Sequence, residues 1–302
     1  MIPSEIVAIM QNISQSHVVL NTIQALSACV LTTCFLRKDT STQQFEQIKA
    51  AKFDEALTGL LNSGKMTHME LFKAKNFLDV AKKADEMYYK NKNTDINDSN
   101  YNFDWFINFF ENVGNVSDET VQDIWARILA QEIDSPNSVS IKTINILKNI
   151  GRNEAILFQN MSKYSLIYNN ASYIPNNDIY LKEYDIAYSD ILLLNEYGLI
   201  NNGPLVSLNF MVNDEYSLIS QNDNLCIIAK SNGVDVHKIS FNCFTYTSSG
   251  NEINNVLNIK ADNDKLLKFA HIIRYKWKNT LIEVRPYTVI NGEVKLGDEQ
   301  IL

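Results

Sequence analysis

Few side chains in this sequence have the types and spacing that metal binding or nucleophilic catalysis requires. The four histidines form neither an HExxH nor an HxH motif, and the four cysteines form no CxxC pair. No glycine-rich phosphate-binding loop and no GxSxG nucleophile elbow is present. We therefore predict no metal ligand, no cofactor-binding residue and no small-molecule substrate. Buried, reduced thiols are the expected state of Cys29, Cys34, Cys226 and Cys243.

Two groups of carboxylates come closest to a catalytic arrangement. Asp118, Glu119 and Asp123 lie at the expected start of a helix, where acidic side chains cap backbone amides and complement the helix dipole. Glu132 and Asp134 form a possible carboxylate pair, but an ion pair between Glu132 and another element is the favoured interpretation. We predict structural roles for both groups and no catalytic residue, so the protein is not expected to be an enzyme.

The strongest pattern lies between residues 103 and 158, which predict four short capped helices. Gly114 and Pro136 separate helices, Ser117 is an expected N-cap, and either Ser138 or Ser140 is expected to cap the third helix. This region is expected to be a compact bundle that acts as a scaffold, with tryptophans that anchor a core rather than stack on bases. The predicted structural core contains Trp105, Trp125, Ile128 and Leu129.

The composition favours a protein built mainly from helices. Its 302 residues are 45% hydrophobic and 21% charged, with only 10 glycines and 5 prolines, which argues for long helices and few tight turns. We expect an α+β, mostly helical fold. Its parts would be N-terminal helices (1–92), a polar linker (93–102), a central helical bundle (103–165) and a C-terminal α/β domain (166–302).

A long apolar segment at residues 18–36 is followed directly by Arg37 and Lys38. Its length could span a bilayer, but polar residues dilute it, so a buried or oligomer-facing helix is favoured over a membrane-embedded one. The first residues lack the basic region and cleavage site of a secretory signal. We expect a cytoplasmic protein, or alternatively one associated with the inner membrane.

The C-terminal part contains β-branched and aromatic segments typical of strands, after a short helix at residues 189–197. This order resembles a winged helix, a fold that often binds DNA. The presumed reading helix carries Asp190 and Glu196 but no lysine or arginine, so contact with a protein is favoured over contact with DNA. Residues 165–185, rich in tyrosine and asparagine, are expected to be a loop with a short extended piece.

The net charge of −8 argues against nucleic-acid binding, although one basic segment keeps that function open. The candidate nucleic-acid contacts are Lys268, Arg274 and Lys278, which do not form one clean stripe on a helix.

Several spaced motifs resemble the bacterial DUF2806 family. The central motif reads WARILAQEI at residues 125–133, and the downstream motifs read GLI at residues 198–200 and FTYTSSGNE at residues 244–252. Asn137 stands where a glycine is common in the family. A weaker similarity connects the chain with the abortive-infection alpha family. The DUF2806 family has no established activity, so the resemblance implies an architecture and a setting among bacterial mobile-element or phage-defence genes.

The predicted function is that of a non-enzymatic interaction or sensor subunit in a bacterial phage-defence or stress-response system. Its partner would be another protein or a second copy of the chain. Two alternatives remain open: a winged-helix protein that binds nucleic acid, and a membrane-acting abortive-infection effector that uses residues 18–36.

Overall fold

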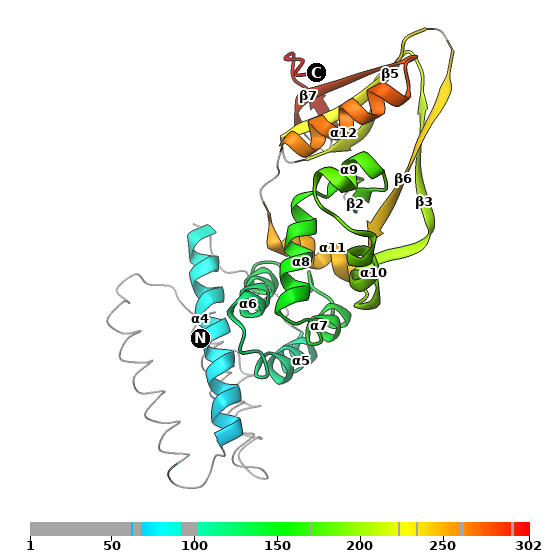
Figure 1. The fold of residues 1–302 in the computed structure, drawn as a ribbon. Coiled ribbons are helices and arrows are strands. Elements are labelled where there is room, and N and C mark those ends of the chain that lie inside the picture. The colour runs from blue at the N-terminus through cyan, green and yellow to red at the C-terminus, as the bar shows by residue number, and fades with distance from the viewer. Residues whose placement is uncertain are drawn as a thin grey trace. The chain divides into compact units, whose positions relative to one another are not determined.

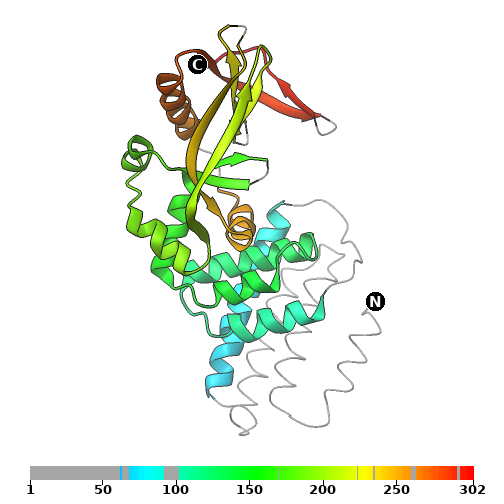
Figure 2. The ribbon, with the colours of Figure 1, turned by 90° about the vertical axis from the view of Figure 1, so that its right-hand side faces the viewer.

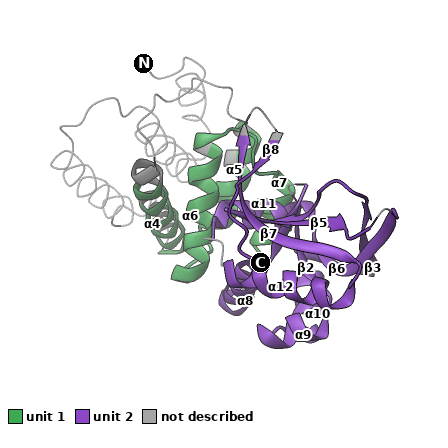
Figure 3. Ribbon diagram, turned by 90° about the horizontal axis from the view of Figure 1, so that it is seen from above, with its two compact units in different colours: residues 1–148 green, residues 149–302 purple. Residues whose placement is uncertain are grey.

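The computed structural model describes residue 62 and residues 68–91, 102–169, 171–222, 224–233, 235–259, 263–290 and 293–302. The chain divides into two compact units, residues 1–148 and residues 149–302 (Figure 3). The apolar segment 18–36 and all of the expected linker except Asn102 lie outside the described residues. Within the described ranges, no helix has the length and apolar character needed to cross a bilayer.

The first unit contains four described helices: α4 (His68–Asn91), α5 (Phe103–Val113), α6 (Glu119–Asp134) and α7 (Ile141–Leu147). Side chains that accept backbone N–H bonds begin three of them. Asn102 caps α5, Asp118 caps α6 in place of the expected Ser117, and Ser140 caps α7.

The core of this unit is aromatic where α5 meets α6 and α7. The Phe109 ring stacks on Trp105 at 5.1 Å and meets Trp125 edge-on at 5.2 Å. Trp105 Nε1 donates to Val139 O over 2.7 Å, which satisfies the one polar atom of its side chain. All four residues of the predicted structural core are buried, namely Trp105, Trp125, Ile128 and Leu129.

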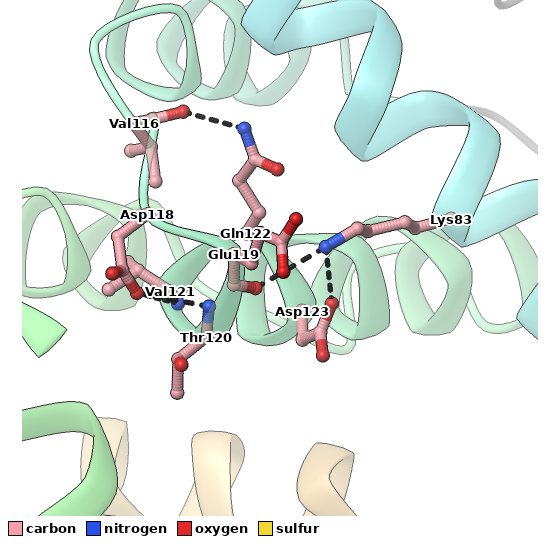
Figure 4. Close-up of polar contacts among 8 residues, drawn as sticks. All are labelled: Lys83, Val116, Asp118, Glu119, Thr120, Val121, Gln122 and Asp123. Atoms are coloured by element: carbon pink, nitrogen blue, oxygen red, sulfur yellow. Dashed lines mark hydrogen bonds and ion pairs between the residues drawn. The ribbon is translucent and has the colours of Figure 1, made fainter.

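Helix α4 packs against α6, and a polar contact marks the start of α6 (Figure 4). Lys83 Nζ donates to Asp123 Oδ1 over 2.6 Å and to Glu119 O over 3.3 Å. The Asp118 carboxylate accepts from Thr120 N and Val121 N. Asp118 therefore caps α6, and Asp123 forms a partly exposed ion pair with Lys83. An ion pair of this type contributes about 0–1 kcal/mol to stability.

The described residues of the second unit form five helices and one antiparallel sheet (Figures 1 and 2). Its helices are α8 (Arg152–Lys163), α9 (Asp178–Glu183), α10 (Tyr188–Glu196), α11 (Ser248–Leu257) and α12 (Asn263–Lys276). Its strands are β1 (Leu166–Tyr168), β2 (Ala171–Pro175), β3 (Ile200–Val212), β4 (Ser217–Gln221), β5 (Leu225–Ser231), β6 (His237–Tyr246), β7 (Thr280–Ile290) and β8 (Glu293–Leu296). The eight strands follow the order β3-β6-β2-β1-β4-β5-β7-β8.

Two parts of the fold prediction are wrong. The described residues are 48% helical and 26% strand, so the α+β class is correct but "mostly helical" is not. The C-terminal part is also not winged-helix-like, because the strands after α10 join one sheet of eight instead of forming a small wing. The expected bundle ended at residue 165, whereas the division at residue 148 places α8 in the second unit.

The sheet bends strongly, which gives the second unit a closed aromatic core. Strand β3 pairs with β6 at one edge, yet it also packs against β4 and β5. Ser231 N donates to Asn213 O over 2.6 Å at this approach. Helix α12 covers β5 and β7, and its Phe269 ring meets Phe241 edge-on at 4.9 Å.

Candidate binding site at the end of helix α12

A pocket of about 280 Å³ lies beside the last two turns of α12. Three segments line it: residues 175–177 from the end of β2 to the start of α9, residues 240–242 of β6, and α12 with Trp277. Asn176 N donates to Asn242 O over 2.9 Å, and the Asn177 side chain caps α9, so the first two segments are held together. The pocket wall combines aromatic and aliphatic side chains with asparagines, a serine and a lysine.

Basic and aromatic residues alternate at the end of α12, from Arg274 through Tyr275, Lys276 and Trp277 to Lys278. Trp277 N donates to Ile273 O, and Thr280 N donates to Trp277 O. These bonds hold the residues after the helix in a defined turn that leads into β7. We call these five residues and the adjoining pocket the α12-end site.

The aromatic and cationic side chains of the α12-end site are accessible. Tyr275 is 81% exposed, and Trp277 is half-buried and lines the pocket. Lys276 Nζ lies 4.4 Å from the centroid of the Trp277 ring. At exposed sites such a cation–π contact stabilises by only about 0.5–1 kcal/mol. A ligand can therefore displace the ammonium from the ring at little cost.

The structure separates the three predicted nucleic-acid contacts. Arg274 and Lys278 are exposed and belong to the α12-end site. Lys268 lies earlier on α12, and its ammonium forms a 3.0 Å ion pair with Glu183 of α9. Lys276 belongs to the same basic segment of the sequence but was not among the candidate contacts, and sequence reasoning missed Trp277 as a member of the site. The alternation of basic and aromatic residues over positions 274–278 is the signal that could have identified them.

The charge of the chain segment that carries the α12-end site differs from that of the whole chain. No acidic residue occurs between Asp264 and Glu283, although the net charge is −8. Lys265 within this interval is buried, and its ammonium donates to Lys163 O over 2.6 Å. Arg274, Lys276 and Lys278 form no ion pair with any carboxylate of the described residues. These cations complement the negative end of the helix dipole and remain able to contact an anion.

The described thiols and histidine contacts suit structural roles. Cys226 and Cys243 are buried free thiols, and burial raises their pKa values to about 11 and about 12. A thiol protonated at neutral pH is a poor nucleophile. His237 Nε2 is hydrogen-bonded to Thr280 Oγ1 at 2.7 Å. Among the described residues, no group of three or more histidine, cysteine or acidic side chains could hold a metal ion.

The Glu132 carboxylate stabilises a turn. It accepts hydrogen bonds from Asn137 N at 2.6 Å and from Val139 N at 3.2 Å, and it is buried. The expected ion pair is thus replaced by backbone amides. Burial raises the pKa of Glu132, and the amide hydrogen bonds oppose that shift.

Lowering the pH is expected to stabilise the wild-type protein relative to Glu132→Gln. Because the folded-state pKa of Glu132 is raised, the folded protein binds this proton at a higher pH than the unfolded chain does. The free energy of unfolding of the wild-type protein therefore increases as the pH falls through the folded-state pKa. The increase is complete below the pKa of the unfolded chain, which is about 4.3. Chemical denaturation of both proteins between about pH 7 and pH 4 measures the difference. A difference that is constant or of opposite sign contradicts the prediction.

The two downstream motifs meet at one backbone junction. Thr247 Oγ1 donates to Gly198 O over 2.6 Å, and Thr247 N donates to Leu199 O over 3.0 Å. Gly250 N donates in turn to Thr247 Oγ1 at the start of α11. Leu199 O approaches Gly250 so closely that a β-carbon there would lie 2.0 Å from it. The GLI motif and the glycine of the later motif are thus two halves of one packing contact.

The match to a family model extends over both units. A family described as "Protein of unknown function (DUF2806)" matches residues 65–268. The chain belongs to the DUF2806 family. No curated protein and no solved structure matches it. The DUF2806 match contains the Gly198–Gly250 junction and two of the three pocket walls, but it ends before Arg274.

Asn137, where the family resemblance leads us to expect a glycine, adopts a conformation that suits glycine. Asn137 has a φ of 65°, in the left-handed region where glycine is unstrained. Asparagine is the side chain that most readily replaces glycine in this region. The turn after α6, in which Asn137 N donates to Glu132, is therefore compatible with either residue.

Proposed function

We propose that this DUF2806 protein is a non-enzymatic interaction or sensor subunit of a bacterial phage-defence or stress-response system. It recognises an anionic partner through the α12-end site. The cellular setting follows from the family resemblance, and the site follows from the surface of the second unit.

One observation carries the proposal. Arg274, Lys276 and Lys278 present three cations without a carboxylate partner among the described residues, beside a pocket, in a chain of net charge −8. Long-range repulsion disfavours non-specific contact between an acidic chain and a polyanion. A concentrated basic surface on such a chain is suited to a local, specific contact.

Charge reversal at the α12-end site is expected to weaken retention of the full chain on immobilised heparin, used as a generic polyanion. The variant Arg274→Glu, Lys276→Glu, Lys278→Glu removes the cations and repels the anion, so it should elute at lower salt than the wild type. All three side chains are exposed, so the substitutions should lower the thermal unfolding midpoint only modestly, through the lost interaction of the cations with the C-terminal end of α12.

A matched control separates the site from the net charge. The variant Lys142→Glu, Lys148→Glu, Lys238→Glu alters three other exposed lysines and changes the net charge equally. It should elute close to the wild type. Equal loss of retention in both variants, or no retention of the wild-type protein at low salt, refutes the α12-end site as an anion-binding surface.

A further inference from the structure

We infer that the anion recognised by the α12-end site is a nucleotide, either free or as one unit of a single-stranded nucleic acid. This inference rests on the proposed function, because it names the ligand class of the same site. It adds a chemical requirement that charge alone does not impose, namely an aromatic base.

The size and lining of the pocket suit a single base. Small-molecule sites usually have volumes of about 300–1,000 Å³, so a pocket of about 280 Å³ lies just below that range and leaves room for a small ring system only. Phe269 and Trp277 both belong to its wall, and of these two only the half-buried Trp277 is exposed enough to stack on a ligand. An aromatic ring can stack on any nucleobase, because every base has a π-face.

Two asparagines of the pocket wall have side-chain amides that are held by hydrogen bonds. Asn177 Oδ1 accepts from the backbone of α9, and Asn242 Oδ1 accepts from Ser207 Oγ over 2.6 Å. These bonds fix the orientation of both amides. Their Nδ2 groups make no hydrogen bond within the described part of the chain, so both amides retain donors.

The cations are placed beside the aromatic ring that lines the pocket. Lys276 is covalently adjacent to Trp277 and already contacts its ring, while Arg274 and Lys278 flank the pair in the sequence. A base stacked on Trp277 would bring its own phosphate within reach of these side chains. A duplex keeps its bases paired and stacked, so it cannot offer one to a pocket without unpairing it. An acidic peptide would use the cations but not the ring.

The test measures fluorescence anisotropy of the full chain with labelled single-stranded RNA and DNA oligonucleotides and with a duplex of equal length. The single strands should bind at least about tenfold more tightly than the duplex, and Trp277→Ala should weaken their binding by about tenfold. Trp277→Phe should retain most of the affinity, because a ring remains. Tyr188→Ala removes another exposed aromatic residue of the second unit and should have no effect.

Charge and ligand source are tested in the same assay. A plot of log affinity against log salt concentration has a negative slope. The triple charge-reversal variant should reduce the magnitude of this slope by about two, since each single-strand phosphate contact contributes about 0.7. Adenosine monophosphate is then added as a competitor. Displacement of the oligonucleotide identifies a site for a free nucleotide, and a lack of displacement identifies a site that requires the strand. Both results support the inference.

Equal affinity for duplex and single strands overturns the inference, as does an unchanged affinity in Trp277→Ala. Lys276→Gln, at an exposed position, serves as a second variant in case Trp277→Ala fails to fold, and an unchanged affinity there is equally contrary. If heparin retention depends on the α12-end site while no oligonucleotide or nucleotide binds, the inference fails and the proposed function stands. If heparin is not retained either, both fail.

Discussion

Replacing Gly250 with alanine is expected to destabilise the second unit by about 3 kcal/mol or more. A β-carbon at this position would lie 2.0 Å from Leu199 O and 3.3 Å from a ring carbon of Tyr246. Leu199 O is a backbone atom that already accepts from Thr247, so it cannot rotate away as a side chain could. Either α11 or the segment after α10 must move, and the hydrogen bonds between Thr247 and residues 198–199 are then lost.

Thermal unfolding measures this effect, and Gly233→Ala is the matched control. No atom lies within 4 Å of a β-carbon built at Gly233. Its φ is outside the positive region, so alanine should be neutral or stabilise by up to about 1 kcal/mol through a less flexible unfolded chain. Similar unfolding midpoints for Gly250→Ala and Gly233→Ala would show that the close approach to Leu199 is not a constraint.

The substitution Phe269→Ala is expected to reduce the free energy of unfolding by about 3–5 kcal/mol, the usual loss for a fully buried aromatic side chain. Phe269 is 1% exposed, and its ring contacts those of Phe241, Tyr180 and Tyr173 at centroid distances of 4.9, 5.9 and 6.4 Å. It thereby connects α12 with α9, β6 and β2. Removing the ring leaves a cavity among four elements whose rings cannot all shift to fill it.

Denaturant unfolding of Tyr275→Ala provides the comparison for Phe269→Ala. Tyr275 lies on the same helix but is 81% exposed, so its loss should change the free energy of unfolding by less than about 0.5 kcal/mol. A small effect of Phe269→Ala would mean that α12 does not depend on the aromatic core. The α12-end site would then lack the rigid support that the proposed function requires.

Local patterns predicted most of the helices because their determinants are close in sequence. The apolar spacing and the caps at Asn102, Asp118 and Ser140 act within one or two helical turns. The hairpin of β7 and β8 has an equally local determinant, because a turn sequence separates two segments rich in β-branched residues. The shift of the α6 cap from Ser117 to Asp118 is the one-residue error expected where two capping side chains adjoin.

The prediction of a loop at residues 165–185 was wrong, because the determinants of the strands there are far apart in the sequence. Strands β1 and β2 are 3 and 5 residues long, too short for a clear alternating pattern. Strand β2 nevertheless lies in the sheet between β1 and β6, with residues 172–175 buried. Its partner residues in β6 lie about seventy positions further along the chain, as in the pair Tyr173 and Thr245. Such pairing depends on the assembled sheet and leaves no local signal.

The sequence by itself determined the absence of familiar catalytic motifs, the capped helices around Trp125 and the family to which the chain belongs. Tertiary structure decided which basic residues remain available to a ligand. Lys265, Lys268 and Arg274 look equivalent along the chain, yet the first is buried against Lys163 O and the second pairs with Glu183. Only the last lies exposed near the pocket. The physical reason is that electrostatic partners are chosen by proximity in space, and the elements that supply them are far away in sequence.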